Sequence, residues 1–234
     1  MDERDMPAGS PILMENRGWE WALALFLHGL FFVFMLEYHR WRGRDYFESL
    51  RSFLFVANKA MGIASVFSIG FSLAAGSLNR LLRLPAAAVR LRRPLGVVGA
   101  FGILPHVVVS LLFLGWKFDL KYFVGRWPVT ALGIAALAGF LWLAALSWPW
   151  ALQRLGTAKW KAWQQTGYVL ILAVFLHAVV LTGKLANWTD WFRKIGRPDN
   201  APVPPGSVVI ALCILLVLGL KAADGVAGAL RRRP

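Results

Sequence analysis

The sequence predicts an all-α membrane protein in which six transmembrane helices form one bundle. Of its 234 residues, 58% are hydrophobic, above the share of roughly 45 to 50% in ordinary soluble domains. Six separate windows are apolar over the length of about 20 residues that a helix needs to cross the hydrocarbon core of a bilayer. The connections between them are too short to hold a folded soluble domain.

These windows follow one another along the chain, and the longest connection covers residues 77–94. The predicted spans are residues 19–38, 53–76, 95–115, 128–148, 166–185 and 203–221. We therefore expect a cytoplasmic N-terminal segment over residues 1–18, a transmembrane domain over 19–222 and a basic tail over 223–234. The N-terminal segment lacks the order of charged, apolar and small residues that marks a cleaved signal peptide, so the first span is expected to be retained.

The formal net charge of +14 reflects Lys and Arg residues that stand between apolar spans, as membrane topology requires. Nucleic-acid binding is not expected, because base recognition needs a folded soluble module. The side that holds both termini carries slightly more Lys and Arg, which predicts that both termini are cytoplasmic. The single cysteine, Cys213, lies in an apolar run and can form neither an internal disulfide nor a thiolate metal cluster.

Histidines supply the candidate site, because an ionisable side chain at membrane depth is costly and by default marks function. His106 and His177 lie well inside two spans that run in the same direction, so each could offer a ring nitrogen to one metal from opposite sides. His28 lies mid-way along the first span and fits either a ligand or a residue bonded to a neighbouring helix. His39, at the end of that span beside Arg40, is expected at the membrane interface.

The residues before His106 refine this expectation. Gly99 and Gly102 fall on the helix face beneath the histidine, which predicts either a slot for a flat group or close packing of a neighbouring helix. Pro105 removes one backbone hydrogen bond and is expected to kink the helix just below His106.

Neutral imidazole suits iron, and axial histidine is a usual way to hold haem. Zinc fits less well, because no Cys, Asp or Glu lies deep in the spans near these histidines to complete a tetrahedral site. Four cations expected on the periplasmic side could pair with haem propionates, as the cytoplasmic charges could for a deeper haem: Lys117, Lys121, Arg126 and Lys184. Lys184 stands about 10 Å of helix beyond His177, whereas Lys59 is expected only to extend to the membrane surface.

Several motifs then resemble the ferric-reductase-like transmembrane domain family, and within it the haem-binding membrane subunit of the bacterial periplasmic methionine sulfoxide reductase system. The similarity covers about residues 50–185. The residues that carry it are Arg92-Arg93-Pro94-Leu95-Gly96, Ala100-Phe101, Pro105-His106, Arg126-Trp127-Pro128 with Gly133, Arg154-Leu155-Gly156, Trp160, Tyr168 and His177. The resemblance implies a haem protein of the bacterial inner membrane that acts with a periplasmic or membrane redox partner protein.

One position departs from the family pattern. The family often has a second histidine thirteen residues before His177, about 20 Å along a helix, and this chain has Gln164 there. Glutamine is a poor axial ligand, and no histidine lies near Arg92, at the matching level of the third span. We therefore expect one haem b, held by His106 and His177, with a quinone or a flavin as possible electron donor.

The predicted function is a membrane cytochrome b subunit that carries electrons to a partner at the periplasmic side. Without a soluble reductase domain, the chain is expected to be one subunit of an oxidoreductase system and not a complete enzyme. The alternative is a structural or assembly subunit that keeps this fold with a reduced redox role. Gln164 and the basic tail motivate that alternative.

Overall fold

The computed structural model describes residues 18–42, 49–83, 86–180, 182–197 and 200–231, which form helices and no strand. Six helices are long and apolar enough to cross a membrane, which confirms the predicted fold class. They are α2 (Gly18–Arg42), α3 (Leu50–Leu82), α5 (Arg92–Val108) with the π-helical η3 (Val109–Phe113), α7 (Trp127–Leu146), α8 (Pro149–Phe175) with the π-helical η4 (Leu176–Val180), and α10 (Gly206–Leu230). Three short helices connect them: α4 (Ala86–Arg90), α6 (Leu120–Gly125) and α9 (Lys184–Arg193).

The helix ends differ from the predicted windows in places where polar residues continue a helix beyond the apolar run. Helix α3 extends to Leu82, and α4 occupies part of the expected loop over 77–94. The fifth span begins far earlier, at Pro149, and Gly156 interrupts α8 with a φ of 70°, a left-handed conformation that favours glycine. Lys184 starts α9 and so does not belong to the fifth span, while α10 continues past residue 222 to Leu230.

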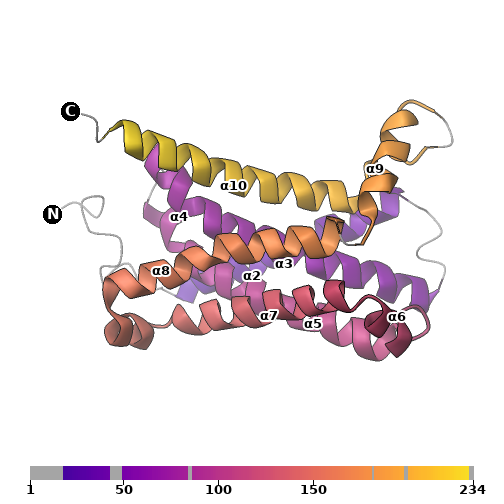
Figure 1. Ribbon diagram of the computed structural model, residues 1–234, viewed down its shortest axis with the longest axis horizontal. Coiled ribbons are helices and arrows are strands. Elements are labelled where there is room, and N and C mark those ends of the chain that lie inside the picture. Colours follow the sequence, from indigo (N-terminus) through magenta and orange to yellow (C-terminus); the bar gives the residue numbers. More distant parts are fainter. Residues whose placement is uncertain (1–17, 43–48, 84–85, 181, 198–199, 232–234) are drawn as a thin grey trace.

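Four helices form a ring in which each packs against two neighbours: α3 on α5, α5 on α7, α7 on α8, and α8 on α3. Helices α5 and α8 therefore occupy opposite corners, as do α3 and α7. Helix α2 covers α3 and α5 from outside, and α10 packs against α3 and α8. Figure 1 shows α6 and α9 at one end of the bundle, which we call the α6/α9 end; α10 finishes at the other end, which we call the termini end.

Ion pairs fasten the outer helices at the termini end. The buried carboxylate of Glu20 on α2 lies 2.8 Å from Nε of Arg90 on α4. Arg80 on α3 donates from Nε to both carboxylate oxygens of Asp224 on α10, at 2.7 and 2.9 Å. This ion pair holds the C-terminal part of α10 against α3.

Two aromatic residues of the family motif position α8 within the ring. Trp160 donates from Nε1 to the carbonyl of Leu146 on α7 at 2.8 Å, and Tyr168 donates from its hydroxyl to the carbonyl of Leu73 on α3 at 2.9 Å. Both donors are satisfied by backbone carbonyls of neighbouring helices, so α8 is fixed on both sides.

The predicted slot beneath His106 is wrong, because neighbouring helices fill it. A Cβ at Gly99 would lie 3.0 Å from both the backbone nitrogen of Ile69 and the carbonyl oxygen of Ser65, and one at Gly102 would lie 2.5 Å from Cε1 of His28. These glycines instead allow α3 and α2 to approach α5 closely, the other role that small residues play in membrane helices.

Gly99→Ala is expected to lower the free energy of unfolding by about 1–3 kcal/mol, because a methyl group there meets backbone atoms that cannot rotate away. The apparent melting temperature in detergent measures the effect. Gly29→Ala on α2 is the matched control, since nothing lies within 4 Å of a Cβ there and alanine favours a helix over glycine. Equal melting temperatures for the two variants would contradict close packing of α3 on α5.

Candidate functional site

His106 on α5 is oriented by α3. Its Nδ1 lies 2.9 Å from the carbonyl oxygen of Asn58, and its ring lies against Gly62, where a Cβ would be 3.3 Å from Nδ1. In a helix, the side chain four residues after a carbonyl leans back over that carbonyl. The missing side chain at Gly62 therefore leaves the Asn58 carbonyl open to the imidazole.

His177 in η4 is held in the same way by α7. Its Nδ1 lies 2.8 Å from the carbonyl oxygen of Val129, and a Cβ at Gly133 would lie 2.7 Å from Cε1 of the ring. Gly133 follows Val129 by four positions, as Gly62 follows Asn58. The two histidines thus lie at opposite corners of the ring, and each is oriented in the same way by a helix at one of the other two corners.

These bonds fix which nitrogen carries the proton. A carbonyl oxygen can only accept, so Nδ1 of His106 and of His177 is protonated and Nε2 keeps a lone pair. Neither Nε2 hydrogen-bonds to any residue that the structure describes. The two Nε2 lone pairs therefore belong to helices at opposite corners of the same ring of four.

Both histidines are associated with π-helical turns. His177 lies within η4, and η3 begins at Val109, directly after the helix that contains Pro105 and His106. The N–H of Val109 donates to the carbonyls of both Pro105 and His106. Single π-helical turns are rare and often occur at functional sites.

His28 and His39 have other surroundings. Nδ1 of His28 lies 3.0 Å from Oγ of Ser68 on α3, which is the bonding to a neighbouring helix that the sequence allowed. His39 lies in the last turn of α2; its side chain is buried, and its Nε2 has no hydrogen-bond partner among the described residues. A Cβ at Gly206 would lie 3.1 Å from its ring, so packing of α10 over α2 covers it.

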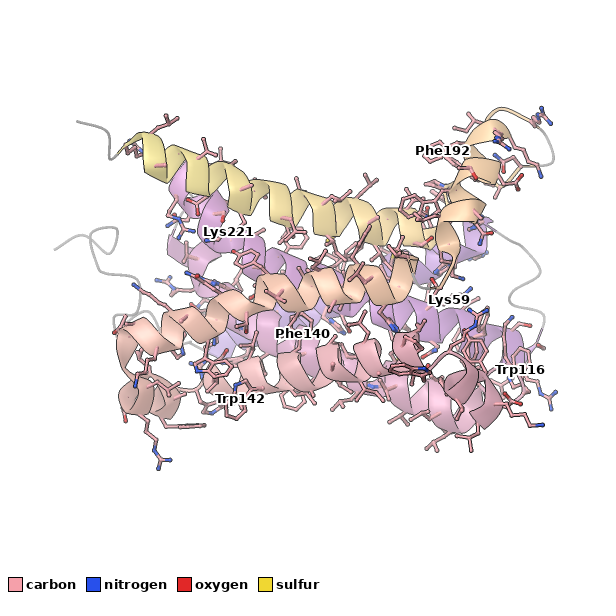
Figure 2. All side chains as sticks on the ribbon, in the orientation of Figure 1. Lys59, Trp116, Phe140, Trp142, Phe192 and Lys221 are labelled. Atoms are coloured by element: carbon pink, nitrogen blue, oxygen red, sulfur yellow. The ribbon has the colours of Figure 1, made fainter. Side chains whose placement is uncertain are left out.

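Four cations gather at the α6/α9 end, close in sequence to the groups that orient the histidines. Lys59 follows Asn58 directly, and its Nζ lies 3.9 Å from the ring centre of Phe55, which Nζ of Lys117 approaches to 4.1 Å. Figure 2 shows Lys59 near the base of α9. The other two members are Arg126 and Lys184.

Burial lowers the pKa of Lys184, and the charges of Arg126 and Lys117 lower it further. None of these cations forms an ion pair with another residue in the described ranges, so the group is suited to an anion. Lys121, which the sequence placed with them, lies on α6 and is exposed, as Lys117 and Arg126 are. The sequence missed Lys59, because a lysine near a span end most often only extends to the surface.

Gln164 lies on α8 in the half of the bundle nearer the termini end. Its Nε2 is 3.5 Å from both the carbonyl of Leu143 and Oγ of Ser147 on α7, at the limit of hydrogen bonding. It lines a cavity that none of the four histidines reaches.

No family model matches the chain. A curated protein of Bordetella parapertussis, the protein-methionine-sulfoxide reductase heme-binding subunit MsrQ, is 32% identical over 174 residues, which cover 70% of this chain and 72% of that protein. The protein of the same name from Bordetella bronchiseptica has the same identity and coverage, and that of Bordetella pertussis is 29% identical over the same shares. The chain belongs to the MsrQ family.

Membership in the MsrQ family confirms the resemblance predicted from the motifs. What the sequence did not reveal in this MsrQ chain is the set of groups that orient the two histidines: the carbonyls of Asn58 and Val129 and the glycines Gly62 and Gly133. Gly133 belonged to one of the family motifs but had no role assigned to it, and Gly62 belonged to no motif. A glycine four residues after the accepting carbonyl is the signal for such an orienting group, and a helical wheel could have revealed it.

Proposed function

We propose that the chain is a membrane cytochrome b subunit that holds one haem b between His106 and His177 and passes electrons to a redox partner protein at the α6/α9 end. The observation that carries the proposal is the matched orientation of the two imidazoles by carbonyls of the facing helices. Haem supplies one-electron chemistry, and the protein supplies its ligands, its position and its electrostatic surroundings. The Bordetella relatives are named heme-binding subunits.

The residues fit haem in several respects. Metal-bound histidine commonly donates its other ring N–H to a backbone carbonyl, as His106 and His177 do. Cofactor sites of helical bundles are built by side chains on facing helices, and α5 and α8 face each other across the ring. Within the described residues no group of three His, Cys, Asp or Glu could hold a metal ion, whereas haem needs only the two axial ligands.

Positive charge supports the placement of the haem toward the α6/α9 end. Lys59, Lys117, Arg126 and Lys184 would neutralise the two propionates, and Arg126 precedes Val129 by three residues, about 4.5 Å along a helix. The proposal places this end on the periplasmic side and both termini in the cytoplasm, in the bacterial inner membrane. A quinone or a flavin would then supply electrons from the other end.

The stoichiometry of one haem rests on Gln164. Its amide offers no strong ligand for iron, and none of the residues around its cavity is a histidine. A haem in that half of the bundle would therefore lack both axial ligands.

Purified protein is expected to contain one b-type haem per chain by the pyridine haemochrome assay. His106→Ala and His177→Ala are each expected to lose most of it, because each removes one of the two axial ligands. His28→Ala is the control, since His28 lies at comparable depth and contacts Ser68 instead. Full haem content in folded His177→Ala would overturn the ligand assignment, and haem-free wild-type protein would favour a structural subunit.

Gly133→Ala is expected to weaken haem retention about 10- to 100-fold, the usual cost of disturbing a group that orients a metal ligand. The added methyl would lie 2.7 Å from Cε1 of His177 and push the ring from the Val129 carbonyl. Gly139→Ala on the same helix is the control, because its methyl meets only the flexible Leu170 side chain, at 2.5 Å. Haem transfer to apomyoglobin measures haem retention in both variants. Equal loss of haem from the two would argue against the orienting role of Gly133.

A further inference from the structure

A second feature of the ring lies outside the proposed haem site. At the termini end, residues of α3, α4, α5, α7 and α8 line an open cavity of about 290 Å³. Pockets that bind drug-sized ligands run from about 300 to 1,000 Å³, so this cavity suits a headgroup and is small for a macrocycle. Phe140, near the middle of the bundle in Figure 2, belongs to its apolar wall together with Leu73 and Leu143.

The polar part of the cavity is strongly basic. It includes five cations: Arg80, Arg90, Arg92, Arg93 and Lys161. Asp224 pairs with Arg80, and Glu20 pairs with Arg90, so acids of the outer helices neutralise two of the five. No acid lines the cavity itself.

Of the five cations in the cavity, Arg92 is the one best placed to bind a ligand. Its guanidinium lies between the helices against Gly76, where a Cβ would come within 3.2 Å of Nη1. The guanidinium forms no hydrogen bond or ion pair with any residue in the described ranges, and the same holds for the ammonium group of the more exposed Lys161. The Arg92 side chain is half-buried and lines the cavity, and a partly desolvated charge without an acidic partner is stabilised by an anion beside it.

We infer that this cavity binds the phosphate headgroup of an anionic phospholipid from the leaflet at the termini end. Basic pockets between transmembrane helices are suited to such headgroups. Arg92 and Lys161 would hold the phosphate, while the amide of Gln164, only loosely bonded to α7, would donate to the headgroup. The apolar wall formed by Leu73, Phe140 and Leu143 favours an amphiphile over a free ion.

The test uses delipidated full-length protein in detergent, with phosphatidylglycerol, phosphatidylcholine or inorganic phosphate added. Phosphatidylglycerol is expected to raise the melting temperature and to remain bound in native mass spectrometry, whereas the zwitterionic lipid and phosphate have little effect. Equal stabilisation by inorganic phosphate would overturn the lipid assignment. Equal stabilisation by phosphatidylcholine would overturn the role of net negative charge.

Arg92→Gln distinguishes a ligand site from a structural arginine. Without lipid the variant is expected to be at least as stable as wild type, because a half-buried charge without an acidic partner is gone. With phosphatidylglycerol the variant is expected to be less stable than wild type. Its affinity for this lipid is expected to fall about tenfold or more, the range for a lost hydrogen bond to a charged group. Lower stability of Arg92→Gln without lipid, together with unchanged lipid affinity, would show a structural role and overturn the inference.

Two exposed lysines on α8 provide a second, matched test, because substitution of an exposed side chain is not expected to disturb folding. Lys161→Gln is expected to weaken phosphatidylglycerol binding about fivefold, and Lys159→Gln, which lies at the same end but outside the cavity, by less than about twofold. Equal effects would indicate only diffuse surface charge. Haem counted in the same samples keeps this test separate from the haem proposal, and a second haem lost in Lys161→Gln would overturn the lipid assignment.

Discussion

The site depends on two hydrogen bonds from imidazole Nδ1 to helix carbonyls that glycine leaves open. In a helix each carbonyl is already engaged and is covered by the side chain four residues later. Gly62 and Gly133 remove that cover beside Asn58 and Val129, so His106 and His177 reach the backbone of the neighbouring helices. Each bond fixes a tautomer and a ring direction at once. In the ring of four helices, the two histidines come from opposite corners, and the helices at the other two corners, α3 and α7, orient them.

Charge is distributed differently at the two ends of the ring. At the termini end, acids of α2 and α10 neutralise Arg90 and Arg80, which fastens the outer helices and leaves Arg92 over the cavity. At the α6/α9 end the lysines near Phe55 have no acidic partner among the described residues. Both groups are suited to anions, but only the one at the α6/α9 end accompanies paired imidazoles. Gln164 stands where the family resemblance led us to expect a histidine, and for this reason the two halves of one bundle are proposed to bind different molecules.

Hydropathy was sufficient to predict six spans and their order, because each apolar run must be helical to satisfy its backbone in lipid. It could not predict that α8 begins at Pro149 or that α3 reaches Leu82, since those turns are polar and are fixed by contacts such as Trp160 with Leu146. The depth of His106 and His177 marked both as candidate ligands from the sequence alone. Their partners are backbone carbonyls, which carry no residue identity. The sequence also left two roles open for Gly99 and Gly102, a slot for a flat group or close helix packing, and the structure has the packing.

Electron paramagnetic resonance of the oxidised protein tests the central claim most directly, because the spin state of ferric haem reports its axial ligands. Two imidazoles oriented as His106 and His177 are here give a strong ligand field. The account predicts a single low-spin ferric signal that integrates to one spin per chain. A high-spin signal, as expected for iron with one protein ligand, or two distinct low-spin signals would contradict it.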